Sequence, residues 1–165
     1  EHDAAPCAHA EVAALALELG ADVPVFVFGR NAFAEGVGER LQTLAMGPAW
    51  YLVLVPETAV STAEIFSAPE LTRNTNAITM SAFSVGSGLN NDLEPVVCRR
   101  HPQVARHLEW LRRYGEARMT GSGACVFCAF DAEDQAGRVL AKLPADMRGF
   151  VARGLDRHPL WQEGG

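Results

Sequence analysis

The sequence predicts an α+β fold, in which short apolar strands alternate with amphipathic helices. The segment 50–55 is a continuous run of aromatic and aliphatic residues, which is typical of a buried strand. Residues 131–143 repeat apolar side chains along one helical face, and the strand-like segments 124–130 and 149–153 lie on either side. This alternation after Trp50 indicates a small α+β sandwich.

Composition sets the class of protein. The chain has 165 residues, 48% hydrophobic and 21% charged, which suits one globular domain or one and a half. The net charge of −6 argues against a nucleic-acid partner, because such binding depends on Lys and Arg. No apolar run approaches the roughly 18 residues that span a bilayer, so no membrane segment is expected. Four cysteines are too few for a disulfide framework, which predicts a cytoplasmic protein.

The first third of the chain begins with a helix over 8–19, where apolar residues recur at intervals of three and four. We expect 23–28 to be a buried strand, because the run is short, apolar and β-rich, and 32–38 to be a glycine-loosened strand paired with it. The segment 40–49 contains Gly47-Pro48 and is expected to be a linker.

The rest of the chain carries clear helix signals. Ser61 and Glu64 form a capping-box pattern, so a short helix is expected to open at Ser61 and run through Phe66. Residues 71–89 are expected to be mostly loop, with a helical turn around 78–83. Pro95 suits the first turn of a further helix. The remaining expected elements are a helix over 96–100, a longer helix bearing Val104, Leu108 and Leu111, a strand over 124–130, a helix over 131–143 and a strand over 149–153.

Asp22 is a candidate general base. It lies between the helical pattern that ends at Gly20 and the apolar run that begins at Val23, so it is expected at a helix-to-strand corner. Pro24 is expected to prevent the helix from resuming. A lone turn aspartate is usually only a local hydrogen-bond acceptor, so the residues alone leave both interpretations open.

The segment Thr120-Gly121-Ser122-Gly123 is a candidate anion cradle. Glycines allow successive backbone N–H groups to face one point, and the hydroxyls of Thr120 and Ser122 can add donors. The alternative is a plain tight turn before a strand, because a Gly-x-Gly spacing has little specificity without a matching context.

Cys125 and Cys128 have metal-ligand spacing but are expected to pack in the core. Residues three apart on a strand point to opposite faces, which separates the two thiols. We therefore predict no metal site. Phe66 taken alone is expected to be a core residue of its short helix.

Five segments together give a resemblance. They are Leu19–Phe26, Phe33–Gly38, Arg73–Thr75, Asn91–Pro95 and Met119–Phe127, in that order. On these segments the chain resembles the GHMP superfamily of small-molecule kinases, in particular those of non-mevalonate isoprenoid synthesis, over nearly its whole length beyond Ala10.

The resemblance implies a GHMP-kinase C-terminal domain over 37–165, with a ferredoxin-like antiparallel sheet and helices. Residues 1–36 would be the tail of an N-terminal, ribosomal-S5-like kinase domain. The implied function is ATP-dependent phosphorylation of the 2-hydroxyl of 4-diphosphocytidyl-2-C-methyl-D-erythritol, with Mg²⁺ as the accompanying ion.

The resemblance also implies roles for site residues. Asp22 matches the family's catalytic aspartate, which accepts or orients the proton of the attacking hydroxyl. Thr120, Gly121, Ser122 and Gly123 match a glycine-containing motif beside the reacting phosphates. Phe66 matches an aromatic residue that stacks on cytosine, and Thr62 lines the same pocket.

The family's main ATP loop and its catalytic lysine have no match here. No glycine cluster is longer than Gly86-Ser87-Gly88, and Lys142 is the only lysine. We therefore expect a truncated kinase that is inactive alone and has the missing N-terminal half as its partner. The alternatives are a non-catalytic α+β module that binds a ligand or a partner, and another GHMP kinase acting on homoserine, mevalonate or a sugar.

Overall fold

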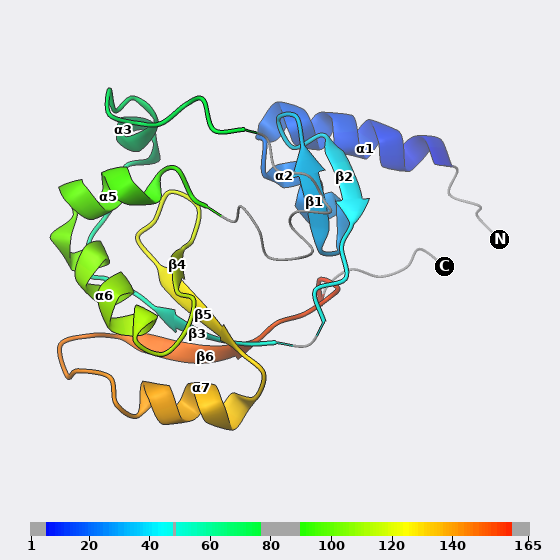
Figure 1. Ribbon diagram of the computed structural model, residues 1–165. Coiled ribbons are helices and arrows are strands. Elements are labelled where there is room, and N and C mark those ends of the chain that lie inside the picture. Colours follow the sequence, from blue (N-terminus) through cyan, green and yellow to red (C-terminus); the bar gives the residue numbers. More distant parts are fainter. Residues whose placement is uncertain (1–5, 48, 77–89, 160–165) are drawn as a thin grey trace. The chain divides into compact units, whose positions relative to one another are not determined.

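The computed structural model describes residues 6–47, 49–76 and 90–159, and the chain divides into two compact units (Figure 1). The first unit comprises Glu1–Pro48 together with Leu155–Gly165, and the second comprises Ala49–Gly154. Each unit is described by itself. The helical turn expected around 78–83 and the glycine cluster 86–88 lie outside the described residues.

The first unit starts with helix α1 (Pro6–Leu19), as the apolar spacing predicts. Of the stripe that predicted it, Ala16 is buried, whereas Leu15 and Leu19 are 59% and 81% exposed. Within the described residues, α1 therefore carries its apolar stripe largely on an open surface.

The strand expected over 23–28 is wrong, because these residues form helix α2 (Val23–Phe28). Pro24 lies in the first turn of this helix, where a proline has no intrahelical hydrogen bond to lose. Gly29 ends α2 in the left-handed conformation with φ 68°, and its N–H donates to the Val25 carbonyl. Asp22 therefore occupies a helix-to-helix corner.

The expected strand over 32–38 exists in part but has a different partner. Strand β1 (Ala32–Glu35) pairs antiparallel with β2 (Arg40–Thr43), with Phe33 opposite Gln42. The segment 40–49 is therefore a strand in its first part and a connection only after Thr43. The turn of this hairpin runs through Gly36 and Gly38, both at positive φ.

The second unit is built on a four-stranded antiparallel sheet in the order β4-β5-β3-β6. Its strands are β3 (Trp50–Leu54), β4 (Arg118–Met119), β5 (Val126–Phe130) and β6 (Gly149–Arg153). The expected strands over 50–55, 124–130 and 149–153 are confirmed within one or two residues at each end.

The helices of the second unit also match the sequence signals. They are α3 (Thr62–Phe66), α5 (Glu94–Arg100), α6 (Pro102–Arg112) and α7 (Glu133–Leu140). Ser61 is the N-cap of α3 and accepts a hydrogen bond from the Glu64 N–H at 3.4 Å, as the capping box predicts. Helix α6 packs against β5, and α7 packs against β3 and β6.

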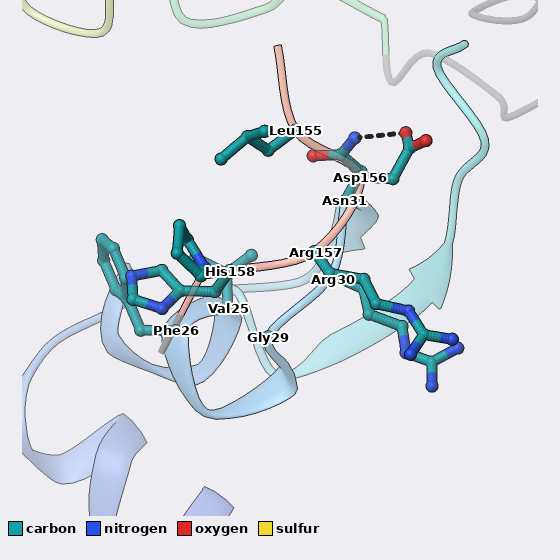
Figure 2. Close-up of a pocket in the computed structure, with 10 residues that line it drawn as sticks. Val25, Phe26, Gly29, Arg30, Asn31, Leu155, Asp156, Arg157 and His158 are labelled. Atoms are coloured by element: carbon teal, nitrogen blue, oxygen red, sulfur yellow. Dashed lines mark hydrogen bonds between the residues drawn. The ribbon is translucent and has the colours of Figure 1, made fainter. Parts of the chain in front are cut away.

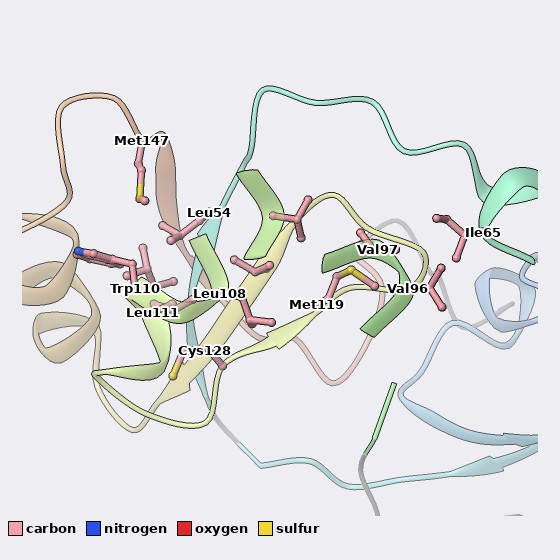
Figure 3. Close-up of a cluster of buried hydrophobic side chains, with 14 of the residues drawn as sticks. Leu54, Ile65, Val96, Val97, Leu108, Trp110, Leu111, Met119, Cys128 and Met147 are labelled. Atoms are coloured by element: carbon pink, nitrogen blue, oxygen red, sulfur yellow. The ribbon is translucent and has the colours of Figure 1, made fainter. Parts of the chain in front are cut away.

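The core of the second unit lies between the sheet and these helices (Figure 3). Leu52 and Leu54 of β3 are fully buried, and so are Leu108 and Leu111 of α6. Ile65 of α3 belongs to the same cluster, so the short helix is anchored to the core by one side chain. No helix in the described ranges has the length and apolarity needed to cross a membrane.

Candidate active site

A glycine-containing turn forms the centre of the candidate site. The Gly123 N–H donates to the Thr120 carbonyl at 2.7 Å, which closes the turn, and Gly121 and Gly123 take φ of 45° and 92°. The Thr120 N–H donates to the Cys125 carbonyl at 2.9 Å, which joins the two ends of the turn. Among the described residues, none accepts a hydrogen bond from the backbone N–H of Gly121 or Ser122.

Two side chains hold this turn in place from the start of α5. The amide Nδ2 of Asn91 donates to the carbonyls of Gly121 at 2.7 Å and Met119 at 3.3 Å. Glu94 accepts from the Met119 N–H at 3.2 Å, while its other oxygen pairs with Arg112 at 2.6 Å. Sequence reasoning assigned no role to Asn91 or Glu94, although both lie in a segment that carries the resemblance.

Helix α3 meets the turn through a pair of hydroxyl groups. Thr62 Oγ1 and Ser122 Oγ are 2.7 Å apart, so one hydroxyl donates to the other across 60 positions of sequence. Phe66 follows Thr62 by one helical turn and therefore shares its face, and it is 55% exposed. The structure thus brings together the Thr62 and Ser122 predicted from sequence, with Phe66 beside Thr62 on an open face. The expectation from its apolar character alone, that Phe66 is a core residue, is wrong.

The carboxyl end of α3 is closed by Arg73. Its guanidinium donates to the carbonyls of Phe66 at 2.7 Å, Ala68 at 3.1 Å and Leu71 at 3.1 Å. These carbonyls lie at or just beyond the helix end, where they lack intrahelical donors. A cation at this end is also favoured by the helix dipole. Arg73 therefore fixes the helix that presents Thr62 and Phe66.

Asp22 belongs to the first unit and is exposed at the N-cap of α2. The hairpin turn packs directly against this corner: a Cβ built on Gly38 would come within 2.2 Å of the Ala21 carbonyl oxygen. Only glycine fits there, because the approach is backbone to backbone. Gly38 thus shapes the corner that carries Asp22.

The chemistry of the turn suits a phosphate better than a metal. Backbone N–H and hydroxyl groups donate to anionic oxygens without adding charge. Within the described residues, no group of three His, Cys, Asp or Glu could hold a metal ion, so none of these residues is assigned as a Mg²⁺ ligand. Cys128 is buried in β5, and burial raises the pKa of its thiol. Cys125, before the strand, is partly buried, and both thiols are free.

A shallow hollow also lies in the first unit (Figure 2). Phe26 and His158 line one end, and Arg30 and Arg157 point together from paired backbone segments. Asn31 donates to Asp156 at 3.2 Å and helps to tie the C-terminal segment to the unit. None of the catalytic or binding residues predicted from sequence lines this hollow.

The comparison with family models decides the class of the second unit. Residues 73–149, which include Arg73, Asn91 and the turn Thr120–Gly123, match the family model "GHMP kinases C terminal". The chain carries a GHMP kinase C-terminal domain. The fold of this domain, helices with an antiparallel sheet, is the fold that the sequence predicts.

The proteins that are similar to this chain are named as kinases of one kind. A 4-diphosphocytidyl-2-C-methyl-D-erythritol kinase of Thiobacillus denitrificans is 66% identical over 90% of this chain and 53% of the relative. A protein of the same name from Nitrosospira multiformis is 62% identical over 88% of this chain and 50% of the relative. A crystal structure of 4-(cytidine 5'-diphospho)-2C-methyl-D-erythritol kinase matches with a TM-score of 0.69 and 33% identity, over 86% of this chain and 56% of that one. The chain therefore spans about half the length of the relatives it matches.

Proposed function

We propose that this chain is the C-terminal part of an ATP-dependent kinase that phosphorylates the 2-hydroxyl of 4-diphosphocytidyl-2-C-methyl-D-erythritol. The names of the similar proteins support the substrate and the reaction type. The order of the matched segments along the chain supports the same assignment.

The hydrogen bond between Thr62 and Ser122 carries the proposal. It joins a helix with an exposed aromatic ring to a turn with outward N–H groups. Phosphoryl transfer from ATP to a cytidylyl substrate needs one surface for the pyrimidine and one for the reacting phosphates, and the hydrogen bond joins two surfaces of these kinds. In this proposal, Phe66 stacks on the cytosine and Thr62 lines its pocket, while Thr120, Gly121, Ser122 and Gly123 support the phosphates.

Asp22 is the proposed general base. Its carboxylate accepts or orients the proton of the attacking hydroxyl, and the N–H groups of the turn donate to phosphate oxygens. Phosphoryl transfer depends on such positioning and charge stabilisation more than on covalent chemistry. ATP supplies the transferred phosphoryl group, and Mg²⁺ neutralises charge on the phosphates when it is bound.

We further propose that residues 1–36 belong to an N-terminal kinase domain whose remainder lies in the half of the relatives that this chain does not match. The exposed apolar residues Leu15, Leu19 and Phe26 support this, because such side chains are usually covered in a complete domain. Residues 37–165 are the proposed C-terminal domain. A cytoplasmic location is supported by the free thiols of Cys98, Cys125 and Cys128.

The test joins this chain to the N-terminal half of the 66% identical relative and measures ATP-dependent phosphorylation of the cytidylyl substrate. We expect no turnover by the chain alone and measurable turnover by the joined protein. Asp22→Asn is expected to lower kcat by about 10²- to 10⁴-fold, the usual contribution of a positioned base.

The matched control is Asp131→Asn, which removes an exposed carboxylate at the end of β5, in the other unit. It is expected to keep the wild-type rate. A wild-type rate in the Asp22→Asn protein would remove Asp22 from the mechanism. A joined protein that folds and binds cytidine diphosphate, yet transfers no phosphate, would favour a binding module.

A further inference from the structure

The peptide bond between Gly121 and Ser122 has a defined direction. This bond is trans, so its carbonyl and its N–H point opposite ways. The Gly121 carbonyl accepts the Asn91 amide at 2.7 Å, and the Ser122 N–H is therefore directed away from Asn91. The preceding peptide behaves in the same way: the Thr120 carbonyl faces the Gly123 N–H inside the turn, so the Gly121 N–H faces outward.

Asn91 bonds directly to this peptide, whereas the Thr62–Ser122 hydroxyl pair and the bond that closes the turn hold the residues beside it. A Cβ built on Gly121 would meet nothing within 4 Å, so the side of the residue where a side chain would lie is open. Glycine itself places few limits on φ and ψ. A rotation of the Gly121–Ser122 peptide would put a carbonyl oxygen where the N–H now points, and a site that attracts anions would then repel them.

Asn91 is suited to preventing that rotation. Its Oδ1 accepts from the Leu93 N–H at 3.1 Å, which orients the amide so that Nδ2 faces the turn. Both protons of Nδ2 then have carbonyl acceptors, on Met119 and Gly121. The Asn91 side chain therefore accepts a hydrogen bond from the start of α5 through Oδ1 and donates hydrogen bonds to the turn through Nδ2.

We propose that Asn91 is a positioning residue for phosphoryl transfer, which keeps the Gly121–Ser122 peptide turned so that its N–H faces the phosphate. This inference rests on the proposed function, because it takes the turn as the phosphate site. Asn91 touches the backbone of the turn and acts through it.

The test substitutes Asn91→Asp, which keeps the shape and the Oδ1 acceptor but replaces the donating NH₂ by an oxygen. Two carbonyls then face a carboxylate, and the turn loses its anchor. The matched control is Asn90→Asp, which adds the same charge at the neighbouring exposed position.

The first readout is the backbone amide signals of Gly121 and Ser122 in ¹⁵N-labelled chain. At neutral pH we expect both signals to move in N91D and to keep their wild-type positions in N90D. As the pH falls and the introduced carboxyl takes up a proton, it can again donate to the Gly121 carbonyl, so the N91D signals should return toward wild type. Substitution effects that arise only from packing do not titrate in this way, because the side-chain shape is unchanged. Unmoved signals at neutral pH would overturn the inference.

The second readout is steady-state kinetics of the joined protein. N91D is expected to lower kcat by up to about 10²- to 10³-fold, the scale of losing one oriented donor, while KM for the cytidylyl substrate stays within about twofold. Moved amide signals with an unchanged kcat would also overturn the inference. If N91D does not fold, Asn91→Ser serves instead, since it removes the amide donors without adding charge. The same movement of the amide signals and the same loss of kcat are then expected, without the return at low pH. Absence of turnover in the wild-type joined protein would be a failure of the proposed function, and the amide signals would still decide whether Asn91 orients the turn.

Discussion

Phe66 and Ile65 are neighbours on α3 with opposite environments, and this contrast gives the sharpest prediction. Phe66 is 55% exposed and Ile65 is 1% exposed. Phe66→Leu keeps an apolar side chain on the helix, so we expect it to lower the free energy of unfolding by less than about 1.5 kcal/mol. It removes the aromatic face, and base–aromatic stacking is worth roughly 1–3 kcal/mol.

That stacking energy corresponds to an increase of about 5- to 150-fold in Kd for cytidine diphosphate. The assay is calorimetric titration of the joined protein, with urea unfolding of the same samples. Ile65→Ala is the matched comparison and is expected to cost about 2–5 kcal/mol of unfolding free energy, because it opens a cavity in the core. An unchanged Kd in Phe66→Leu would refute the assignment of α3 as the pyrimidine surface.

Three further predictions concern stability. Gly38→Ala is expected to lower the unfolding free energy of the first unit by roughly 1–3 kcal/mol in urea, because the new Cβ would meet the Ala21 carbonyl. The control is Gly47→Ala, where φ is also positive but the space around a Cβ is open, so its loss of unfolding free energy should be smaller. Ser61→Ala is expected to cost about 0.5–2 kcal/mol through loss of the N-cap, and no change would show that the cap bond is negligible. Because burial raises the pKa of Cys128, its stabilising contribution is complete below the unfolded thiol pKa of about 8.5 and is lost at higher pH. The unfolding free energy should therefore fall as the pH rises above that value, and it should fall less steeply with pH in Cys128→Ala. An equal pH dependence in the two proteins would show that the Cys128 thiol is not the cause.

The second unit was largely predictable from sequence because its signals are local. The run Trp50–Leu54 is short and apolar at every position, and Ser61 with Glu64 marks a helix start that needs no tertiary information. The prolines that open α5 and α6 fall in first turns, where proline is favoured.

The first unit shows where local signals fail. Helix α2 has six residues, all of them apolar or proline, so there is too little sequence to distinguish a helical period from a strand period. Strand β2 carries one apolar residue, Leu41, between polar neighbours, and the nearby Gly47-Pro48 favoured the interpretation as a linker.

The candidate site was predictable only in part. Thr62 came from the resemblance and Ser122 from the glycine-containing segment itself. No periodicity indicates that positions this far apart share a hydrogen bond. Asn91 was missed because an asparagine before a helix is common for local reasons, and its partners are backbone carbonyls that leave no mark in the sequence. The position of Asp22 next to a turn was recognised, but the kind of corner was not.

Helix α3 has five residues, too few for an isolated helix to persist in water. Its orientation is fixed by Ile65, which packs in the core beneath it, and by the guanidinium of Arg73, which bonds to its carboxyl end. In the proposed site, selectivity among nucleotides can therefore change through substitutions that never contact a ligand, because repacking under the helix would tilt the Phe66 ring. A screen for altered base preference should therefore include the buried positions that pack under α3 as well as the exposed positions on it.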